Sequence, residues 1–173
     1  ALITVDAAGR GGEVPVHIGA RVPMTRPWYA AQAHGDGKGN YDFPVPTQKA
    51  SAERAADALV RIVDENPGQI DIVAIGPLTN IATAVLLDRE FASKVRQLRV
   101  MGGCDNSVGN VSAAAEYNFF VDPEAADIVF RAGFDVTVVT WTLTLARALW
   151  DRDQLAEIAA LGTALSEFFT ILD

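Results

Sequence analysis

Several patterns that mark particular protein classes are scarce in this chain of 173 residues. A single cysteine, Cys104, excludes a disulfide framework and is typical of a reducing compartment, so we expect a cytoplasmic protein. No apolar run approaches the roughly 20 residues that a membrane-spanning helix needs. Lys and Arg number 14 against 22 Asp and Glu, and the net charge of −8 argues against nucleic acid or an anionic membrane as a partner.

The chain also lacks the glycine pattern of a nucleotide-cofactor site. No Gly-x-Gly-x-x-Gly opens a helix after a strand, which disfavours an enzyme that uses such a cofactor. The Gly37-Lys38 pair invites comparison with a phosphate-binding loop, but no strand precedes it and no Ser or Thr follows the lysine. A flexible surface turn is the simpler interpretation of that pair.

What the chain does contain is enough apolar material for one globular domain with a sizeable core, since half its residues are hydrophobic. Apolar periodicity predicts strands that alternate with helices, and we expect the strand at 70–75 to be covered on both faces. This alternation predicts an α/β fold with a mostly parallel sheet flanked by helices. The predicted strands are 13–18, 70–75, 97–101 and 136–140, and the predicted helices are 1–10 (the end of one), 48–65, 78–88, 122–133 and 151–172.

The stretch from Met101 to Arg131 has the order of a site in an α/β protein: strand end, glycine turn, polar loop, helix. Its loop holds Asn110, Glu116 and Asn118. A carboxylate can accept from two hydroxyls at once, and an amide both donates and accepts. These three side chains therefore suit a neutral, hydroxyl-rich ligand such as a sugar.

Three further positions have structural interpretations. Asp122 precedes Pro123, and these residue types are favoured at the N-cap and first position of a helix, so we assign Asp122 a structural task and no catalytic one. Thr79 and Asn80, in the first turn of the helix predicted at 78–88, either cap that helix or line a pocket, and the sequence leaves both open.

These motifs resemble the central block of the nucleoside hydrolases, the inosine/uridine-preferring N-ribohydrolases. A second stretch, residues 76–82, resembles another signature of that family. The resemblance implies the Rossmann-like nucleoside hydrolase fold, and we expect one domain over residues 1–173 that is incomplete at both ends. The matching segments are Met101-Gly102-Gly103, Gly109-Asn110, Ala115-Glu116-Tyr117-Asn118 and Asp122-Pro123-Glu124-Ala125-Ala126.

The resemblance implies hydrolysis of the N-glycosidic bond of ribonucleosides to free base and ribose, with a water held and acidified by Ca²⁺. The family's aspartate cluster falls before Ala1 and its later histidine and aspartate fall after Asp173. We therefore expect a fragment that contains no catalytic residue and is inactive alone. We also expect a homo-oligomer, a dimer or a tetramer. The alternative is a non-catalytic, ribose-binding or nucleoside-binding paralogue that has lost the metal.

The resemblance also implies roles for individual residues. Asn110, Glu116 and Asn118 match the residues that bind the ribose hydroxyls, and Met101 matches one that lines the ribose pocket. Ile75 matches the position whose backbone carbonyl ligates calcium.

Other positions bear on the base. His34 resembles a His-Gly element near the base. The chain departs from the family at residues 140–144, where Thr-Trp-Thr-Leu-Thr replaces Leu-Asp-x-Thr-His, so the base preference stays open. The loop between Gly103 and Gly109 is also about one residue longer than the common pattern.

Overall fold

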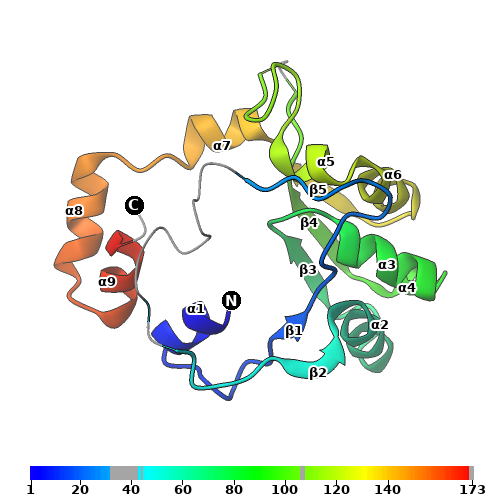
Figure 1. Cartoon of the computed structure of the whole chain (residues 1–173), viewed down its shortest axis with the longest axis horizontal. Coiled ribbons are helices and arrows are strands. Elements are labelled where there is room, and N and C mark those ends of the chain that lie inside the picture. Colours follow the sequence, from blue (N-terminus) through cyan, green and yellow to red (C-terminus); the bar gives the residue numbers. More distant parts are fainter. Residues whose placement is uncertain (32–42, 44, 106–107, 172–173) are drawn as a thin grey trace. The chain divides into compact units, whose positions relative to one another are not determined.

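The structure is a computed structural model that describes residues 1–173 except 32–42, 44, 106–107 and 172–173. The Gly37-Lys38 pair and His34 lie outside the described residues. Figure 1 shows the elements, which follow one another as α1 (Leu2–Ala7), β1 (His17–Ile18), β2 (Ser51–Arg54), α2 (Ala55–Glu65), β3 (Asp71–Ala74), α3 (Thr79–Leu87), α4 (Phe91–Lys94), β4 (Gln97–Met101), α5 (Tyr117–Val121), α6 (Pro123–Arg131), β5 (Val136–Val139), α7 (Trp141–Arg147), α8 (Arg152–Ala160) and α9 (Ala164–Ile171).

The chain divides into two compact units. The first comprises Ala1–His17, Ala30–Ala52 and Leu149–Asp173, and the second comprises Ile18–Tyr29 and Glu53–Ala148. The expectation of one domain over residues 1–173 stays a prediction. The residues with predicted roles that the structure describes all belong to the second unit.

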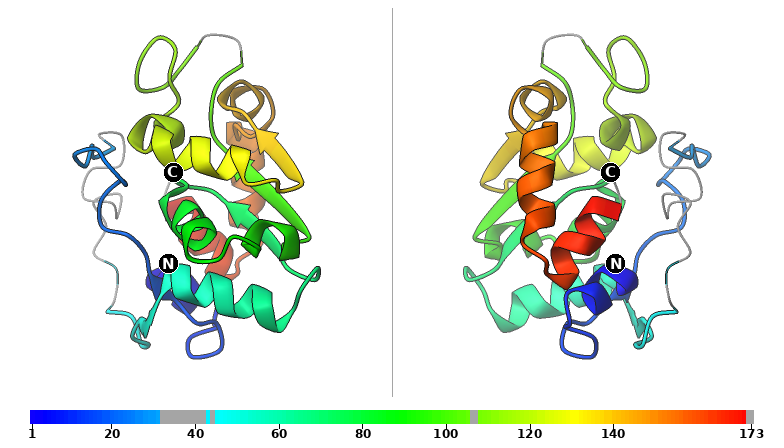
Figure 2. Two further views of the ribbon diagram at one scale, coloured as in Figure 1. Left: turned by 90° about the vertical axis from the view of Figure 1, so that its right-hand side faces the viewer. Right: turned by 90° about the vertical axis from the view of Figure 1, so that its left-hand side faces the viewer.

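The second unit is built on a parallel sheet of three strands in the order β3-β4-β5. Ala74 pairs with Val100, and Met101 pairs with Val139, so the carboxyl ends of the strands meet at one edge. Helices α2, α3, α4 and α6 lie on one side of this sheet, and they face the viewer in the left panel of Figure 2. The predicted α/β fold with a parallel sheet flanked by helices is confirmed.

The core of this unit lies between the sheet and these helices. Leu98 and Val100 of β4 are fully buried, and so are Val63 of α2 and Val129 of α6. Phe91 is also fully buried, and its ring meets that of Phe134 edge to face, with centroids 5.9 Å apart. Alternate strand residues supply this core because successive side chains of a strand point to opposite faces.

The face of the sheet that points away from these helices is more exposed than the sequence predicts. Strand β3 was expected to be covered on both faces, but Val73 is 65% exposed. Arg99 and Thr137, which pair in register on the neighbouring strands, are exposed as well. In the described part of the chain, therefore, this sheet buries one face only. The prediction was wrong because apolar, β-branched residues are typical of strands covered on both faces, but their presence does not require the second face to be covered.

Two further expectations about strands and helices were wrong. The strand predicted at 13–18 is reduced to β1, and β1 joins β2 in a separate two-stranded sheet. Among the described residues the parallel sheet therefore has three strands and not four. Pro15 lacks the N–H that a longer strand would need at that position. The helix predicted from residue 48 begins only at Ala55, after β2.

The helix predicted over 151–172 is divided into α8 and α9. Gly162 between them has φ +58°, a left-handed conformation that glycine adopts at low cost and that ends a helix. Thr163 then accepts a hydrogen bond from the backbone N–H of Ser166 at 3.1 Å, which caps the next helix. Within this first unit, Phe43 packs against Phe168, and Trp150 packs against Phe169.

Among the described residues no helix is both long and apolar enough to cross a membrane.

Candidate functional site

The glycine turn after β4 brings the backbone close to an aromatic ring. A Cβ atom on Gly102 would lie 2.3 Å from Cε1 of Phe119, and one on Gly103 would lie 2.9 Å from Cε2 of the same ring. Gly103 also has φ +71°. Only glycine therefore fits both positions, and the chain can turn directly from the end of the strand into the loop.

Glu116 joins this turn to the next helix. Its side chain is 2% exposed and caps α5, a short helix that the sequence did not predict. One carboxylate oxygen accepts from the backbone N–H of Asn118 at 2.9 Å, and the other accepts from Gly103 at 2.9 Å and Phe119 at 3.3 Å. The negative charge thus lies at the N-terminus of α5, where a carboxylate is stabilised.

The two asparagines are part of the same network. The Nδ2 of Asn118 donates to the backbone carbonyl of Met101 at 3.0 Å, and this amide is 8% exposed. The Oδ1 of Asn110 accepts from the backbone N–H of Tyr117 at 2.8 Å. The structure therefore brings Met101, Asn110, Glu116 and Asn118 together at the carboxyl end of β4, while their predicted role as ribose ligands stays a prediction.

Ile75 lies at the same edge of the sheet. It follows Ala74, the last residue of β3, and its side chain is 80% exposed. Since Ala74 pairs with Val100, Ile75 occupies the level of Met101 on the neighbouring strand. Its position agrees with a role at the carboxyl edge, and its carbonyl as a calcium ligand stays a prediction.

A cavity of about 450 Å³ opens beside Glu116. It is lined by Gly103, Cys104 and Phe119, and Arg26 lies at its margin. The Arg26 guanidinium forms two-pronged hydrogen bonds to Glu124, between 2.8 and 3.0 Å, and this contact lowers the pKa of the Glu124 carboxyl. Because Arg26 is already paired, the charged group in the lining that has no ion-pair partner among the described residues is the Glu116 carboxylate.

Asp122 is the most enclosed carboxylate of the unit, with no exposed surface. It caps α6 through the backbone N–H of Ala125 at 3.1 Å, which confirms the predicted structural task. It also accepts from the backbone N–H of Met24 at 3.0 Å and from the hydroxyl of Thr79 at 2.5 Å. The Asp122 side chain therefore connects three parts of the unit: the segment Ile18–Tyr29, the start of α3 and the start of α6.

Of the two interpretations proposed for Thr79 and Asn80, capping is wrong, whereas Asn80 does line a cavity of about 320 Å³ beside Gly19 and Ala20. The N-cap of α3 is Leu78, with no side-chain cap, so they do not cap their own helix. The hydroxyl of Thr79 donates to Asp122, and the Oδ1 of Asn80 accepts from the backbone N–H of Ala20 at 2.8 Å. Both side chains connect α3 to distant segments that a local sequence pattern cannot identify.

A small polar cluster, formed by Asp105, Thr140 and Thr142, lies at the end of β5. Hydroxyl groups of Thr142 and Thr140 face the exposed carboxylate of Asp105 and lower its pKa, and the Thr140 Oγ1 donates to it at 3.2 Å. The Thr142 Oγ1 is buried. Cys104 donates to the backbone carbonyl of Ala114 at 3.2 Å.

A metal site is not complete in the described residues. They contain no group of three or more His, Cys, Asp or Glu side chains that could hold an ion. Glu116 and Asp122 accept hydrogen bonds from backbone N–H groups, as described above, which occupies much of their capacity to ligate. The residues present therefore do not form a calcium site, which takes about 6–8 oxygen ligands.

The glycine turn, the capped helix and the amide network belong to a chain that matches one protein family along nearly its whole length. Residues 1–172 match the family model of the inosine-uridine preferring nucleoside hydrolases. The chain belongs to this family. The probable uridine nucleosidase 1 of Oryza sativa subsp. japonica is 46% identical over 158 residues, which cover 90% of this chain and 48% of that protein. The chain thus spans about half the length of the curated relatives it matches.

Solved nucleoside hydrolases have the same fold. A plant nucleoside hydrolase superposes with a TM-score of 0.87 at 36% identity, over 97% of this chain and 54% of that one. A purine-preferring ribonucleoside hydrolase from Gardnerella vaginalis superposes with a TM-score of 0.90 at 30% identity, over 99% of this chain and 55% of that one. The family and fold expected from the sequence motifs are therefore confirmed.

Proposed function

We propose that this chain forms the ribose-binding half of an enzyme that hydrolyses the N-glycosidic bond of ribonucleosides to free base and ribose. The observation that carries the proposal is the network at the end of β4, in which backbone hydrogen bonds hold Glu116 and Asn118 and Glu116 lines a cavity. Side chains held in this way lose little further freedom when they bind a ligand, which favours precise contacts.

The four residues of the network would hold the ribose. Glu116 and Asn118 offer carboxylate and amide oxygens to sugar hydroxyls, and Asn110 offers an amide whose Oδ1 is already engaged by Tyr117. Met101 would pack against the sugar. Hydroxyl contacts that tighten as positive charge develops on the ribosyl group lower the barrier to cleavage of the glycosidic bond.

We infer that the ion implied by the family is Ca²⁺, with the carbonyl of Ile75 as the one ligand that this chain would supply. Because the described residues do not complete such a site, we derive no step of the reaction through the ion and expect no turnover from residues 1–173 alone. A non-catalytic, nucleoside-binding protein is the second candidate.

The substrates we propose are ribonucleosides, uridine among them. The support is the rice relative, a probable uridine nucleosidase at 46% identity. A purine-preferring relative also shares the fold at 30% identity, so inosine belongs in the same assay. Assembly into a dimer or a tetramer is a further proposal, which sedimentation velocity would test.

The test uses this chain and a chimera. In the chimera, the matched residues of this chain replace the corresponding half of the rice protein, which supplies the remaining half. Ribose release from uridine and inosine is measured for both proteins with millimolar Ca²⁺ and with chelator, and nucleoside binding by the chain is measured by calorimetry.

We expect calcium-dependent turnover by the chimera and none by the chain. A folded chimera that binds uridine but never releases ribose would support the binding protein instead. Turnover by the chain alone would show that its own acidic residues build the site.

A further inference from the structure

A groove of about 460 Å³ lies between α2 and the end of α3. Helix α3 begins at the carboxyl edge of the sheet, so its last residue, Leu87, lies toward the opposite edge. The groove is therefore separate from the candidate site, and the proposed reaction gives it no task.

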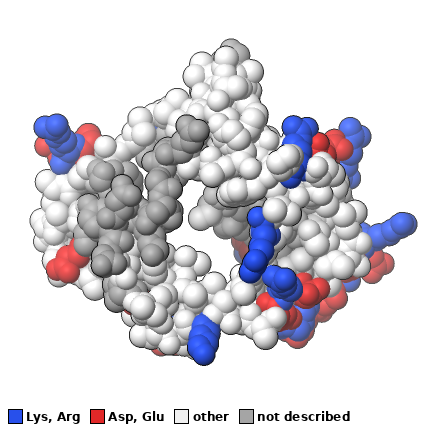
Figure 3. Space-filling model, in the orientation of Figure 1, with Lys and Arg blue, Asp and Glu red and all other residues white. Residues whose placement is uncertain are grey.

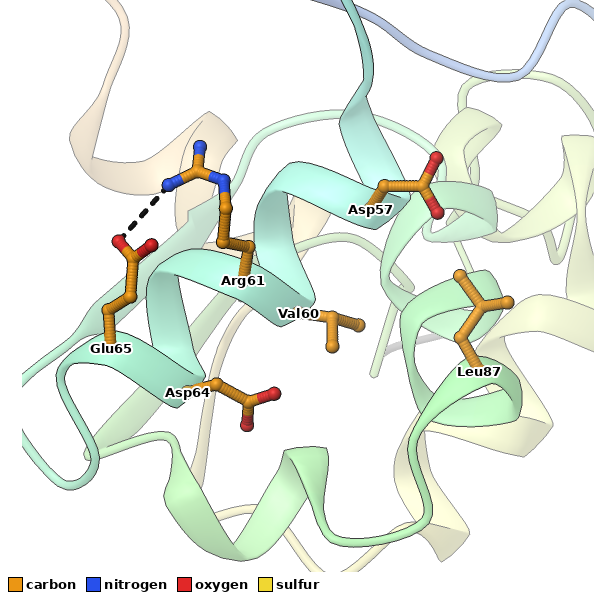
Figure 4. A pocket seen from close by; sticks show the side chains of 6 residues that line it. All are labelled: Asp57, Val60, Arg61, Asp64, Glu65 and Leu87. Atoms are coloured by element: carbon orange, nitrogen blue, oxygen red, sulfur yellow. Dashed lines mark hydrogen bonds and ion pairs between the residues drawn. The ribbon is translucent and has the colours of Figure 1, made fainter.

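The floor of the groove is apolar. Val60 of α2 and Leu87 of α3 point toward one another across it, as Figure 4 shows. Leu87 is 58% exposed, and Leu86 beside it is 60% exposed. Two adjacent leucines at the end of a surface helix leave apolar area in water, and a partner that covers them would gain free energy.

The rim of the groove is acidic. Asp57 and Asp64 flank Val60 on the same face of α2 (Figure 4). Among the described residues Asp57 forms no ion pair, and Asp64 shares Lys94 with another carboxylate. Arg61 is turned toward Glu65, with which it pairs at 3.1 Å. Carboxylates thus outnumber the cation in the lining, within the crowded mixture of charges over α2–α4 in Figure 3.

The spacing of the two aspartates specifies the occupant. Asp57 and Asp64 are seven residues apart on one helix, which is two turns or about 10.5 Å. A second copy of this chain would bring carboxylates against carboxylates, so the charge of the groove disfavours it. A helix with basic residues at i and i+7 and apolar residues at i+3 and i+4 places opposite charges on both aspartates and an apolar face over Val60 and Leu87.

We propose that the groove between α2 and α3 docks such a basic amphipathic helix of a partner protein. This inference does not depend on the proposed hydrolase activity. It predicts an interface whose affinity depends on salt, because the charged contacts lie at the rim.

The experiment uses the 173-residue chain and synthetic helical peptides of about 16 residues, a length at which helices become stable in water. The basic peptide carries Lys at i and i+7 and Leu at i+3 and i+4. An acidic peptide carries Glu in place of both lysines, and a third peptide carries Ser in place of both leucines. Calorimetry at low and high salt measures the dissociation constants, and circular dichroism verifies the fold of each variant.

We expect the basic peptide to bind and the other two to bind at least about 10-fold more weakly. The double charge reversal Asp57→Lys, Asp64→Lys should reverse the preference, so that the acidic peptide binds and the basic one does not. The matched control Asp135→Lys, Glu157→Lys changes the same net charge at exposed positions outside the groove and should leave the preference unchanged.

Leu87→Ser tests the floor separately and should weaken binding of the basic peptide about 10-fold. If the charge-reversal variant does not fold, this variant and the salt dependence decide the matter. Failure of the native chain to bind the basic peptide, or equal effects of the groove and control variants, would overturn the proposal.

Discussion

Two carboxylates begin consecutive helices in the second unit, and they differ in what surrounds them. Glu116 caps α5 and also lines a cavity. Asp122 caps α6, has no exposed surface, and contacts protein groups from Met24, Thr79 and Ala125. The same type of helix cap therefore occurs once beside a cavity and once in the protein interior.

The comparison separates a residue available to a ligand from one used by the fold. A carboxylate has about four acceptor positions. Each carboxylate accepts three described hydrogen bonds, two on one oxygen and one on the other. They differ in their surroundings, since Asp122 has no exposed surface whereas Glu116 borders a cavity. Perturbing Glu116 should therefore change binding and turnover, and perturbing Asp122 should change stability.

The largest effect is expected for Glu116→Gln in the chimera. If Glu116 holds the ribose as proposed, loss of its charge should lower kcat/KM at least ~100-fold, each decade being about 1.4 kcal/mol. Steady-state assays with uridine measure the loss, and a thermal melt separates it from any loss of the helix cap. Near wild-type kinetics would remove Glu116 from the site.

The second effect is on stability. Asp122→Ala should lower the free energy of unfolding by about 2 kcal/mol, because a helix cap is lost and buried donors are left without an acceptor. Urea denaturation of the chain measures it, with Thr79→Val as a matched variant that removes one of the three hydrogen bonds. Unchanged stability together with abolished turnover in the chimera would make Asp122 catalytic.

A smaller effect is expected at the glycine turn that Glu116 holds. Gly102→Ala places a methyl group against the ring of Phe119 and should cost about 1–2 kcal/mol of stability. Gly76→Ala is the control, because a Cβ atom there meets no atom within 4 Å. If both variants melt alike, the close approach of ring and turn is not important for stability.

The smallest effect is expected on the pH dependence of stability, and it involves Asp71, a carboxylate other than Glu116 and Asp122. Arg96, and after it Arg99, lower the pKa of Asp71 to about 2. A carboxyl whose pKa is depressed in the folded state stabilises the protein above its unfolded pKa, and this contribution is lost as the pH falls from about 4 toward about 2. Asp71→Asn should therefore flatten the pH dependence of the urea midpoint in this window. An unchanged slope would show that the exposed pair contributes nothing.

Local patterns predicted much of the second unit. Short apolar runs rich in β-branched residues identified β3, β4 and β5, and the Asp122-Pro123 pair marked the start of α6. The motifs from Met101 to Asn118 identified the family, and the structure brings these residues together. Signals of this kind are readable because strand period and capping chemistry depend on residues close in sequence.

Other features depended on distant contacts. The sequence could not show that Glu116 would bind Gly103, that Thr79 would bind Asp122, or that Val73 would face solvent. It also missed the division of the last helix at Gly162, because a single glycine within a helical pattern is tolerated in many helices.

By itself, then, the sequence determined the family, the parallel α/β sheet and the edge of that sheet at which the candidate site lies, since these follow from local residue types and their spacing. The tertiary structure decided which of two similar carboxylates meets a cavity and which is enclosed. The physical reason is that burial and hydrogen-bond partners are set by segments far apart in the chain, such as Met24 and Asp122, which only folding brings together.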